Sequence, residues 1–80
     1  MNISFTKDAV KALERMDART QQRIRTAILT IPKGDIKPME GQRGRYRLRV
    51  GSWRVLFGMV GEDIVISDIG PRGQIYKGGR

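Results

Sequence analysis

Apolar and charged residues alternate strictly in the segment RYRLRV, residues 45–50. A period of two is typical of a strand with one buried and one solvent-facing side. The next two residues, Gly51 and Ser52, form a Gly-X pair, which favours a two-residue type II′ turn. Beyond the turn the segment WRVLF, residues 53–57, has the composition of a returning strand. The pattern therefore predicts a β-hairpin over residues 45–57.

The two-residue turn also predicts the register of the hairpin. The expected cross-strand pairs are Val50 with Trp53, Arg49 with Arg54, Leu48 with Val55, and Tyr46 with Phe57. One face is then wholly apolar, and we interpret its Tyr46 and Trp53 as core residues, not as platforms on which bases stack. The other face carries Arg45, Arg47, Arg49 and Arg54.

Among the cross-strand pairs, the facing arginines Arg49 and Arg54 say most about function. Like charges directly opposite each other are destabilising, with Cβ atoms roughly 5 Å apart. A basic face whose guanidinium groups spread into water is the simpler explanation. We prefer a second one, in which a polyanion neutralises the cluster, because arginine presents a planar fork suited to phosphate.

The residues before the hairpin predict a short strand, two helices and a loop. Ile3 and Phe5 share a face of a strand within residues 1–5. Thr6 and Asp17 are suitable N-caps for two helices, and Pro32 ends the second. The apolar positions of the helices recur at three- and four-residue steps: Ala9, Val10, Leu13 and Met16, then Ile24, Ala27, Ile28 and Ile31. These stripes are expected to cover the apolar face of the hairpin, and residues 33–44, rich in Gly, Pro and charge, to form a loop.

After the hairpin, Gly61 and Glu62 predict a second turn, and DIVISDI, residues 63–69, a third long strand. A two-residue turn places Ile64 and Ile66 toward the core, but it also turns Asp68 inward. With the strand that follows Ser52 at the centre of the sheet, Ile69 is expected beside Arg54. The tail, residues 70–80, would then bring Arg72 and Tyr76 to the edge of the basic face.

Composition narrows the classes of function. The chain has 80 residues, enough for one domain, and 16 Lys plus Arg against 8 Asp plus Glu give a net charge of +8. Such an excess favours nucleic acid, an acidic protein or an anionic surface as partner. Because the chain has no Cys and no His, it offers neither thiolate metal ligands nor imidazole as acid or base. We expect no metal, no cofactor, no membrane segment and a cytoplasmic location. The arginines on the two helices (Arg15, Arg19, Arg23 and Arg25) are read as ordinary solvated surface.

The chemistry best suited to this set is stabilisation of negative charge at a phosphate. RNA supplies its own nucleophile, the 2′-hydroxyl, so a ribonuclease must align that hydroxyl, neutralise the oxyanion and move two protons. Arginines suit the second task. Proton transfer has no good candidate, because arginine is a poor base and a tyrosine needs neighbouring cations to lower its pKa. Tyr76 could serve in that way, stack on a base, or simply pack at the sheet edge.

The motifs YRLRVGSWRVLF and IGPRGQIYK together resemble the RelE branch of the RelE/ParE toxin superfamily of type II toxin–antitoxin pairs. The resemblance implies an α+β fold over residues 1–80, a single domain in the order β-α-α-β-β-β. Its sheet would be antiparallel, with the two N-terminal helices packed on one face. It also implies a ribosome-dependent endoribonuclease that cuts mRNA in the A site by 2′-hydroxyl attack.

The same resemblance implies roles for individual residues. Arg47 and Arg49 would position the phosphate, Arg54 would stabilise the transition state, and Arg72 and Tyr76 would complete the catalytic set. Arg43, Arg45 and Lys77 are expected to bind substrate. Some relatives have lysine where this chain has Arg47 and Arg49, and many have a basic residue at the position of Pro71. These departures leave the acid and the base unassigned.

The implied partners are mRNA, the ribosomal RNA of the A site and a small antitoxin that is acidic where it meets the toxin. The toxin itself is expected to be a monomer that assembles into toxin–antitoxin complexes. Two alternatives stay open. One is a ParE-like toxin that inhibits DNA gyrase and cleaves nothing; the other is a basic nucleic-acid-binding domain without catalysis.

Overall fold

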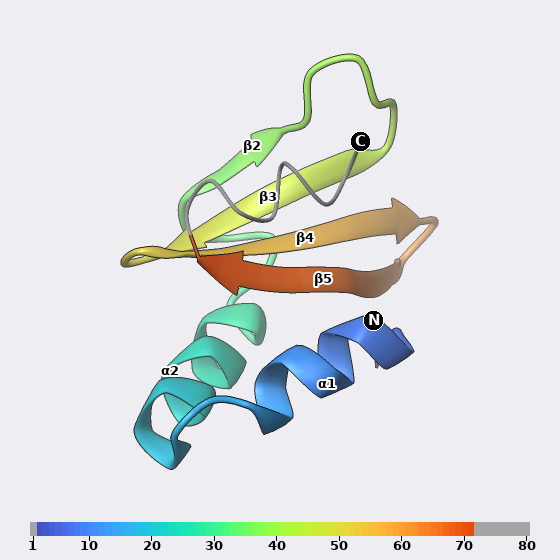
Figure 1. The fold of residues 1–80 in the computed structure, drawn as a ribbon. Coiled ribbons are helices and arrows are strands. Elements are labelled where there is room, and N and C mark those ends of the chain that lie inside the picture. The colour runs from blue at the N-terminus through green and yellow to red at the C-terminus, as the bar shows by residue number, and fades with distance from the viewer. Residues whose placement is uncertain (1, 72–80) are drawn as a thin grey trace.

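The computed structural model describes residues 2–71, which form two helices and a five-stranded sheet (Figure 1). In chain order the elements are β1 (Ile3–Phe5), α1 (Lys7–Glu14), α2 (Ala18–Ile28), β2 (Ile36–Pro38), β3 (Arg45–Val50), β4 (Trp53–Val60) and β5 (Asp63–Pro71). Both helices lie on one side of the sheet. The predicted α+β fold, with two N-terminal helices on one face, is confirmed. Within residues 2–71 no helix is long and apolar enough to cross a membrane.

The sheet has the strand order β1-β5-β4-β3-β2 and is mixed. β1 pairs with β5 in parallel, through Ile3–Ile64 and Phe5–Ile66, whereas the other pairs are antiparallel. The expectation of a purely antiparallel sheet was therefore wrong at this edge. A second difference is β2, which forms within the segment predicted to be loop. Its Pro38 is compatible with an edge strand, where a backbone N–H need not join the ladder.

The hairpin has the predicted register, with Val50 opposite Trp53 and Arg49 opposite Arg54. Gly51 has φ 63°, and Ser52 does not have a positive φ. This combination fits a type II′ turn, in which only the first of the two central residues has a positive φ. β4 lies at the centre of the sheet, also as predicted. The guanidinium group of Arg23, from α2, lies so close to this turn that a Cβ on Gly51 would meet its Nη2 atom at 2.9 Å.

The helices begin at the predicted caps. The side chain of Thr6 accepts a hydrogen bond from the Ala9 N–H, and that of Asp17 accepts one from the Thr20 N–H. Because the hydroxyl of Thr20 also donates to Asp17, at 2.6 Å, these hydrogen bonds hold the pKa of the Asp17 carboxyl below its ordinary value of 3.8.

The core lies between the helices and the sheet. Its largest fully buried side chains are Phe57, Ile24, Ile28, Leu48, Ile64, Ile66 and Val55. Tyr46 stacks on Phe57, with ring centroids 5.6 Å apart, and Trp53 packs against the same cluster, so both are core residues as predicted. Val10 was expected in the helical stripe but is 41% exposed.

A β-bulge in β5 corrects the predicted position of Asp68. Phe57 pairs with Ile66 but Leu56 pairs with Asp68, so Ser67 is the extra residue. The bulge moves Asp68 to the side away from the helices and returns Ile69 to the core, where it is 4% exposed. As a consequence Gly70, not Ile69, is the residue opposite Arg54.

Candidate active site

The side of the sheet opposite the helices carries a cluster of cations, which we call the basic face: Lys37, Arg45, Arg47, Arg49 and Arg54. Strand pairing arranges its central residues in two rows across the sheet. One row contains Arg49, Arg54 and Gly70, and the next contains Lys37, Arg47, Leu56 and Asp68. Neighbouring strands lie about 4.8 Å apart. Three guanidinium groups, those of Arg47, Arg49 and Arg54, thus originate within a patch about the size of one nucleotide.

The first row continues onto the segment before β2 through Asp35. The backbone N–H of Arg49 donates to the Asp35 carbonyl at 3.0 Å, which extends the ladder by one residue. The Asp35 carboxylate also lies 3.2 Å from the Nε of Arg49. Both side chains are about half exposed, so this ion pair contributes about 0–1 kcal/mol to stability. Asp35 therefore gives Arg49 a counter-ion, which the sequence did not predict.

Arg54 is the one charged side chain that is buried among residues 2–71, with 8% exposure. Its Nε is inaccessible to solvent and has no hydrogen-bond partner in the described part of the chain. A buried donor left unpaired costs about 1–3 kcal/mol. Because Arg54 stands between Arg49 and a glycine, the row offers no side-chain carboxylate directly beside it. The position suits an anion supplied from outside.

The second row adds a cation and a carboxylate at its two ends. Lys37 on β2 is exposed and lies opposite the half-buried Arg47. At the other end Asp68 is half-buried opposite the buried Leu56. The Oδ1 atom of Asp68 accepts the N–H of Ile69 at 2.9 Å, so one of its oxygens is already occupied.

Arg45 lies further along β3 and is tied to the bulge. It pairs with Gly58, whose missing side chain leaves room for it: a Cβ there would lie 3.6 Å from the Arg45 Cδ. Arg45 crosses β4 at this point and donates from Nη2 to the Ser67 hydroxyl at 3.0 Å. That hydroxyl in turn donates to the Leu56 carbonyl at 3.1 Å. Arg45, expected to bind substrate, thus links β3 to β5 across the sheet.

Of the remaining predicted site residues, Arg43 is within the part of the chain that the structure describes. Arg43 is exposed in the loop before β3, where the structure does not group it with the three central arginines. Arg72, Tyr76 and Lys77 lie outside the described residues, so their predicted roles stay predictions. No cluster of three or more potential metal ligands occurs within residues 2–71.

Sequence reasoning missed Asp35 and Lys37, which border the basic face. Both belong to the segment IPKGDIKPMEG, whose glycines and prolines indicated a loop. The alternation of Asp35, Ile36 and Lys37 is a weak period-two signal, and Ile36 does pair with Leu48 on the core side. The signal was too short to predict a strand from sequence alone.

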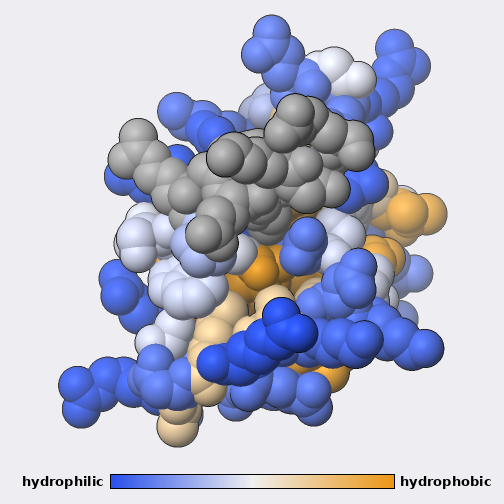
Figure 2. All heavy atoms as spheres, in the orientation of Figure 1, coloured by the Kyte–Doolittle hydropathy of each residue, from blue (hydrophilic) through white to orange (hydrophobic). Residues whose placement is uncertain are grey.

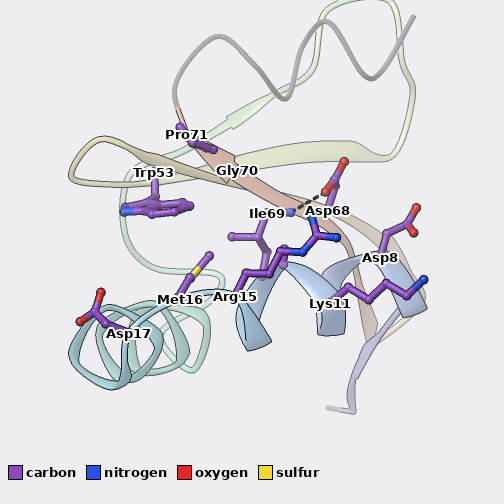
Figure 3. A pocket seen from close by; sticks show the side chains of 11 residues that line it. Asp8, Lys11, Arg15, Met16, Asp17, Trp53, Asp68, Ile69, Gly70 and Pro71 are labelled. Atoms are coloured by element: carbon purple, nitrogen blue, oxygen red, sulfur yellow. Dashed lines mark hydrogen bonds between the residues drawn. The ribbon is translucent and has the colours of Figure 1, made fainter.

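The structure also has a groove beside α1. It is an open groove of about 700 Å³ between α1 and the C-terminal end of β5 (Figure 3). Met16, Trp53, Ile69 and Pro71 supply its apolar lining, and Lys11, Arg15, Asp8, Asp17 and Asp68 are the charged residues around them. The space-filling view shows a hydrophobic area that is surrounded by hydrophilic residues (Figure 2). With charges of both signs, the groove has no preference for a polyanion, unlike the basic face.

Comparisons with a family model and with known proteins point to the same kind of protein. A family model described as the ParE toxin of the type II toxin–antitoxin system parDE matches residues 3–76. Toxin RelE3 of Methanocaldococcus jannaschii is 31% identical over 84 residues, which cover 95% of this chain and 96% of that protein.

Solved structures agree with this result. A chain in the crystal structure of the RelB-RelE antitoxin–toxin complex from Methanococcus jannaschii matches with a TM-score of 0.78 and 28% identity, over 95% of this chain and 98% of the other. The archaeal RelE-RelB complex from Pyrococcus horikoshii OT3 matches with a TM-score of 0.72 and 27% identity, over 91% and 96%. The RelBE complex of E. coli, at 12% identity and a TM-score of 0.75, shares the fold. The chain therefore belongs to the RelE/ParE superfamily of toxins from type II toxin–antitoxin systems.

Proposed function

We propose that this toxin is a cytoplasmic endoribonuclease that cuts mRNA in the ribosomal A site. The observation that carries the proposal is Arg54, a buried guanidinium group with an unpartnered Nε, in the same row as Arg49. The likeness to Toxin RelE3 supports the RelE-type assignment.

In the proposed reaction the scissile phosphate binds over Arg47, Arg49 and Arg54. Attack of the 2′-oxygen crowds negative charge onto the non-bridging oxygens, and preorganised cations stabilise that charge more than they stabilise the ground state. Arg54 needs no reorganisation, because its Nε already lacks a competing partner within residues 2–71. Arg72 and Tyr76 are proposed to approach from the tail. Lys37, beside Arg47, would add a phosphate contact.

A second candidate is supported by one observation: the matching family model is described by the ParE toxin. A ParE-like protein that binds gyrase would need no oxyanion clamp. The alignment of three arginines on one face favours cleavage over this alternative.

The antitoxin partner is proposed from the solved relatives, which are described as complexes of RelE with RelB. With a net charge of +8, this toxin should bind an antitoxin that is acidic at the contact. We propose a monomeric toxin that assembles with it. Co-purification with the product of the adjacent gene, followed by native mass spectrometry, would give the stoichiometry.

The decisive experiment uses ribosomes programmed with a defined mRNA and maps new 5′ ends by primer extension. Wild-type protein should produce codon-spaced cuts in the A site. Arg54→Ala should lower the cleavage rate by about 100-fold or more, as expected for loss of an oxyanion donor. The matched control is Arg25→Ala, which removes an exposed arginine of α2. Intact mRNA with inhibited DNA supercoiling would favour the gyrase toxin, and intact mRNA with salt-sensitive RNA binding would favour a non-catalytic domain.

A further inference from the structure

The proposed reaction needs a group that accepts the proton of the 2′-hydroxyl. Arginine serves this role poorly, and a lysine must first lose its own proton. A carboxylate is a common proton acceptor in enzymes. Two carboxylates border the central arginines of the basic face, Asp35 on the β2 side and Asp68 on β5.

Asp68 fits the role less well. Its Oδ1 atom already accepts the backbone N–H of Ile69 at 2.9 Å. Its position lies opposite Leu56, in the second row, where a buried apolar side chain separates it from Arg47. A hydroxyl held over the first row would not be directly beside it.

Asp35 lies at the end of the first row, next to the arginines proposed to hold the phosphate. Its Oδ2 atom is 3.2 Å from the Arg49 Nε, and its carbonyl accepts the Arg49 N–H, so both ends of the residue are fixed to β3. The carboxylate is 48% exposed, which leaves it accessible to an RNA strand. Arg49 thus orients the carboxylate toward the row without covering it.

The dimensions of the row suit a 2′-hydroxyl between Asp35 and the phosphorus. Reacting atoms in a near-attack geometry lie about 3–3.5 Å apart. A base lies about 2.6–3.2 Å from the oxygen whose proton it takes. The carboxylate should therefore be about 6 Å from the phosphorus. With strands about 4.8 Å apart, the backbone of Asp35 lies about 7 Å from the midpoint between Arg49 and Arg54, and the side chains of this row can close the remaining difference.

We propose that Asp35 is the proton acceptor of this toxin, an assignment that rests on the nuclease function proposed above. The Asp35 carboxylate takes the proton of the 2′-hydroxyl as the 2′-oxygen forms its bond to phosphorus. The bond from phosphorus to the 5′-oxygen breaks, its electron pair stays on that oxygen, and water protonates it. The products are a 2′,3′-cyclic phosphate and a 5′-hydroxyl, and Asp35 returns its proton to solvent.

The test compares single-turnover cleavage by wild-type protein, Asp35→Asn and Asp35→Glu on programmed ribosomes, with protein in excess. The amide of Asp35→Asn can still accept a hydrogen bond from Arg49 but does not accept a proton. It should lower the cleavage rate by about 10²–10⁴-fold. Ribosome affinity, measured by co-sedimentation, should stay within a few-fold. Asp35→Glu, which restores a carboxylate, should recover part of the rate.

The matched control is Asp68→Asn, which removes the other carboxylate of this face and should cleave within a few-fold of wild type. Equal thermal midpoints for the variants would show that each is folded. If wild type cleaves and Asp35→Asn cleaves as fast or faster, Asp35 is only a counter-ion of Arg49. Loss of rate in Asp68→Asn instead, or loss of affinity without loss of rate in Asp35→Asn, would also overturn the assignment. Absence of cleavage by wild type would refute the nuclease itself, and the role of Asp35 with it.

Discussion

Replacing Arg54 by methionine should make the protein more stable while removing its proposed activity. Arg54 is 8% exposed, its Nε is unpartnered among the described residues, and it faces Arg49 across the hairpin. Methionine keeps a long, unbranched apolar body that fills irregular space. The substitution therefore removes the buried charge while leaving much of the packing in place.

The expected gain follows from two contributions. An unpaired buried donor costs about 1–3 kcal/mol, and that cost disappears with the guanidinium group. Relief of the repulsion between Arg54 and Arg49 adds about 0.2–1 kcal/mol. The free energy of unfolding should therefore rise by about 1–4 kcal/mol. For a chain of this size the thermal midpoint should rise by about 4–8 °C for each kcal/mol.

Urea denaturation followed by circular dichroism would measure the gain in Arg54→Met, and calorimetry would give the thermal midpoint. Arg43→Met is the matched control, because Arg43 is exposed and its replacement should change stability by less than about 0.5 kcal/mol. If Arg54→Met proved less stable than wild type by about 1 kcal/mol or more, the guanidinium group would contribute favourable interactions to the folded chain. The claim that Arg54 is held ready for an external anion would then be refuted.

Three further predictions concern the framework that supports the face. Leu48→Ala should lower the free energy of unfolding by about 2–5 kcal/mol in urea denaturation, because Leu48 is 2% exposed, whereas Leu29→Ala, at 74% exposure, should change it by less than about 0.5 kcal/mol. Ser67→Ala should cost about 1–3 kcal/mol in the same assay, because it leaves the Arg45 guanidinium without its hydroxyl acceptor; no loss would mean that the bulge holds without this link. Asp17→Ala should destabilise the protein at neutral pH. Since the folded pKa of Asp17 is lowered, its contribution is present above the ordinary value of 3.8 and is lost as pH falls through the folded pKa, so the difference from wild type should shrink in acid; a pH-independent difference would contradict this.

The hairpin was predictable because its local signals agree. Strict alternation sets the faces of β3, the Gly51-Ser52 pair sets the turn, and together they fix the register through Arg49 and Arg54, as observed. The N-caps were predictable for the same reason, since Thr6 and Asp17 act within one turn of their own position.

What the sequence did not predict depends on distant contacts. β2 is only three residues long and forms because β3 offers an open edge. The parallel pairing of β1 requires β5 as its neighbour in the sheet. No residue near β1 specifies which strand will be that neighbour. The bulge at Ser67 depends on hydrogen bonds with Leu56 and Arg45, far away in the chain. For this reason Asp35 was not recognised as a neighbour of Arg49, and Asp68 was expected on the wrong face.

The most direct test of the account is a pair of mRNAs on programmed ribosomes, identical except for a single 2′-deoxynucleotide at the cleaved position in the A site. Wild-type protein should cut the all-ribose message and leave the deoxy-substituted message intact, because the attacking 2′-oxygen is absent from the second. Cleavage of both messages at the same position would contradict 2′-hydroxyl attack and require another nucleophile. Cleavage of neither would contradict the nuclease function that the basic face is proposed to perform.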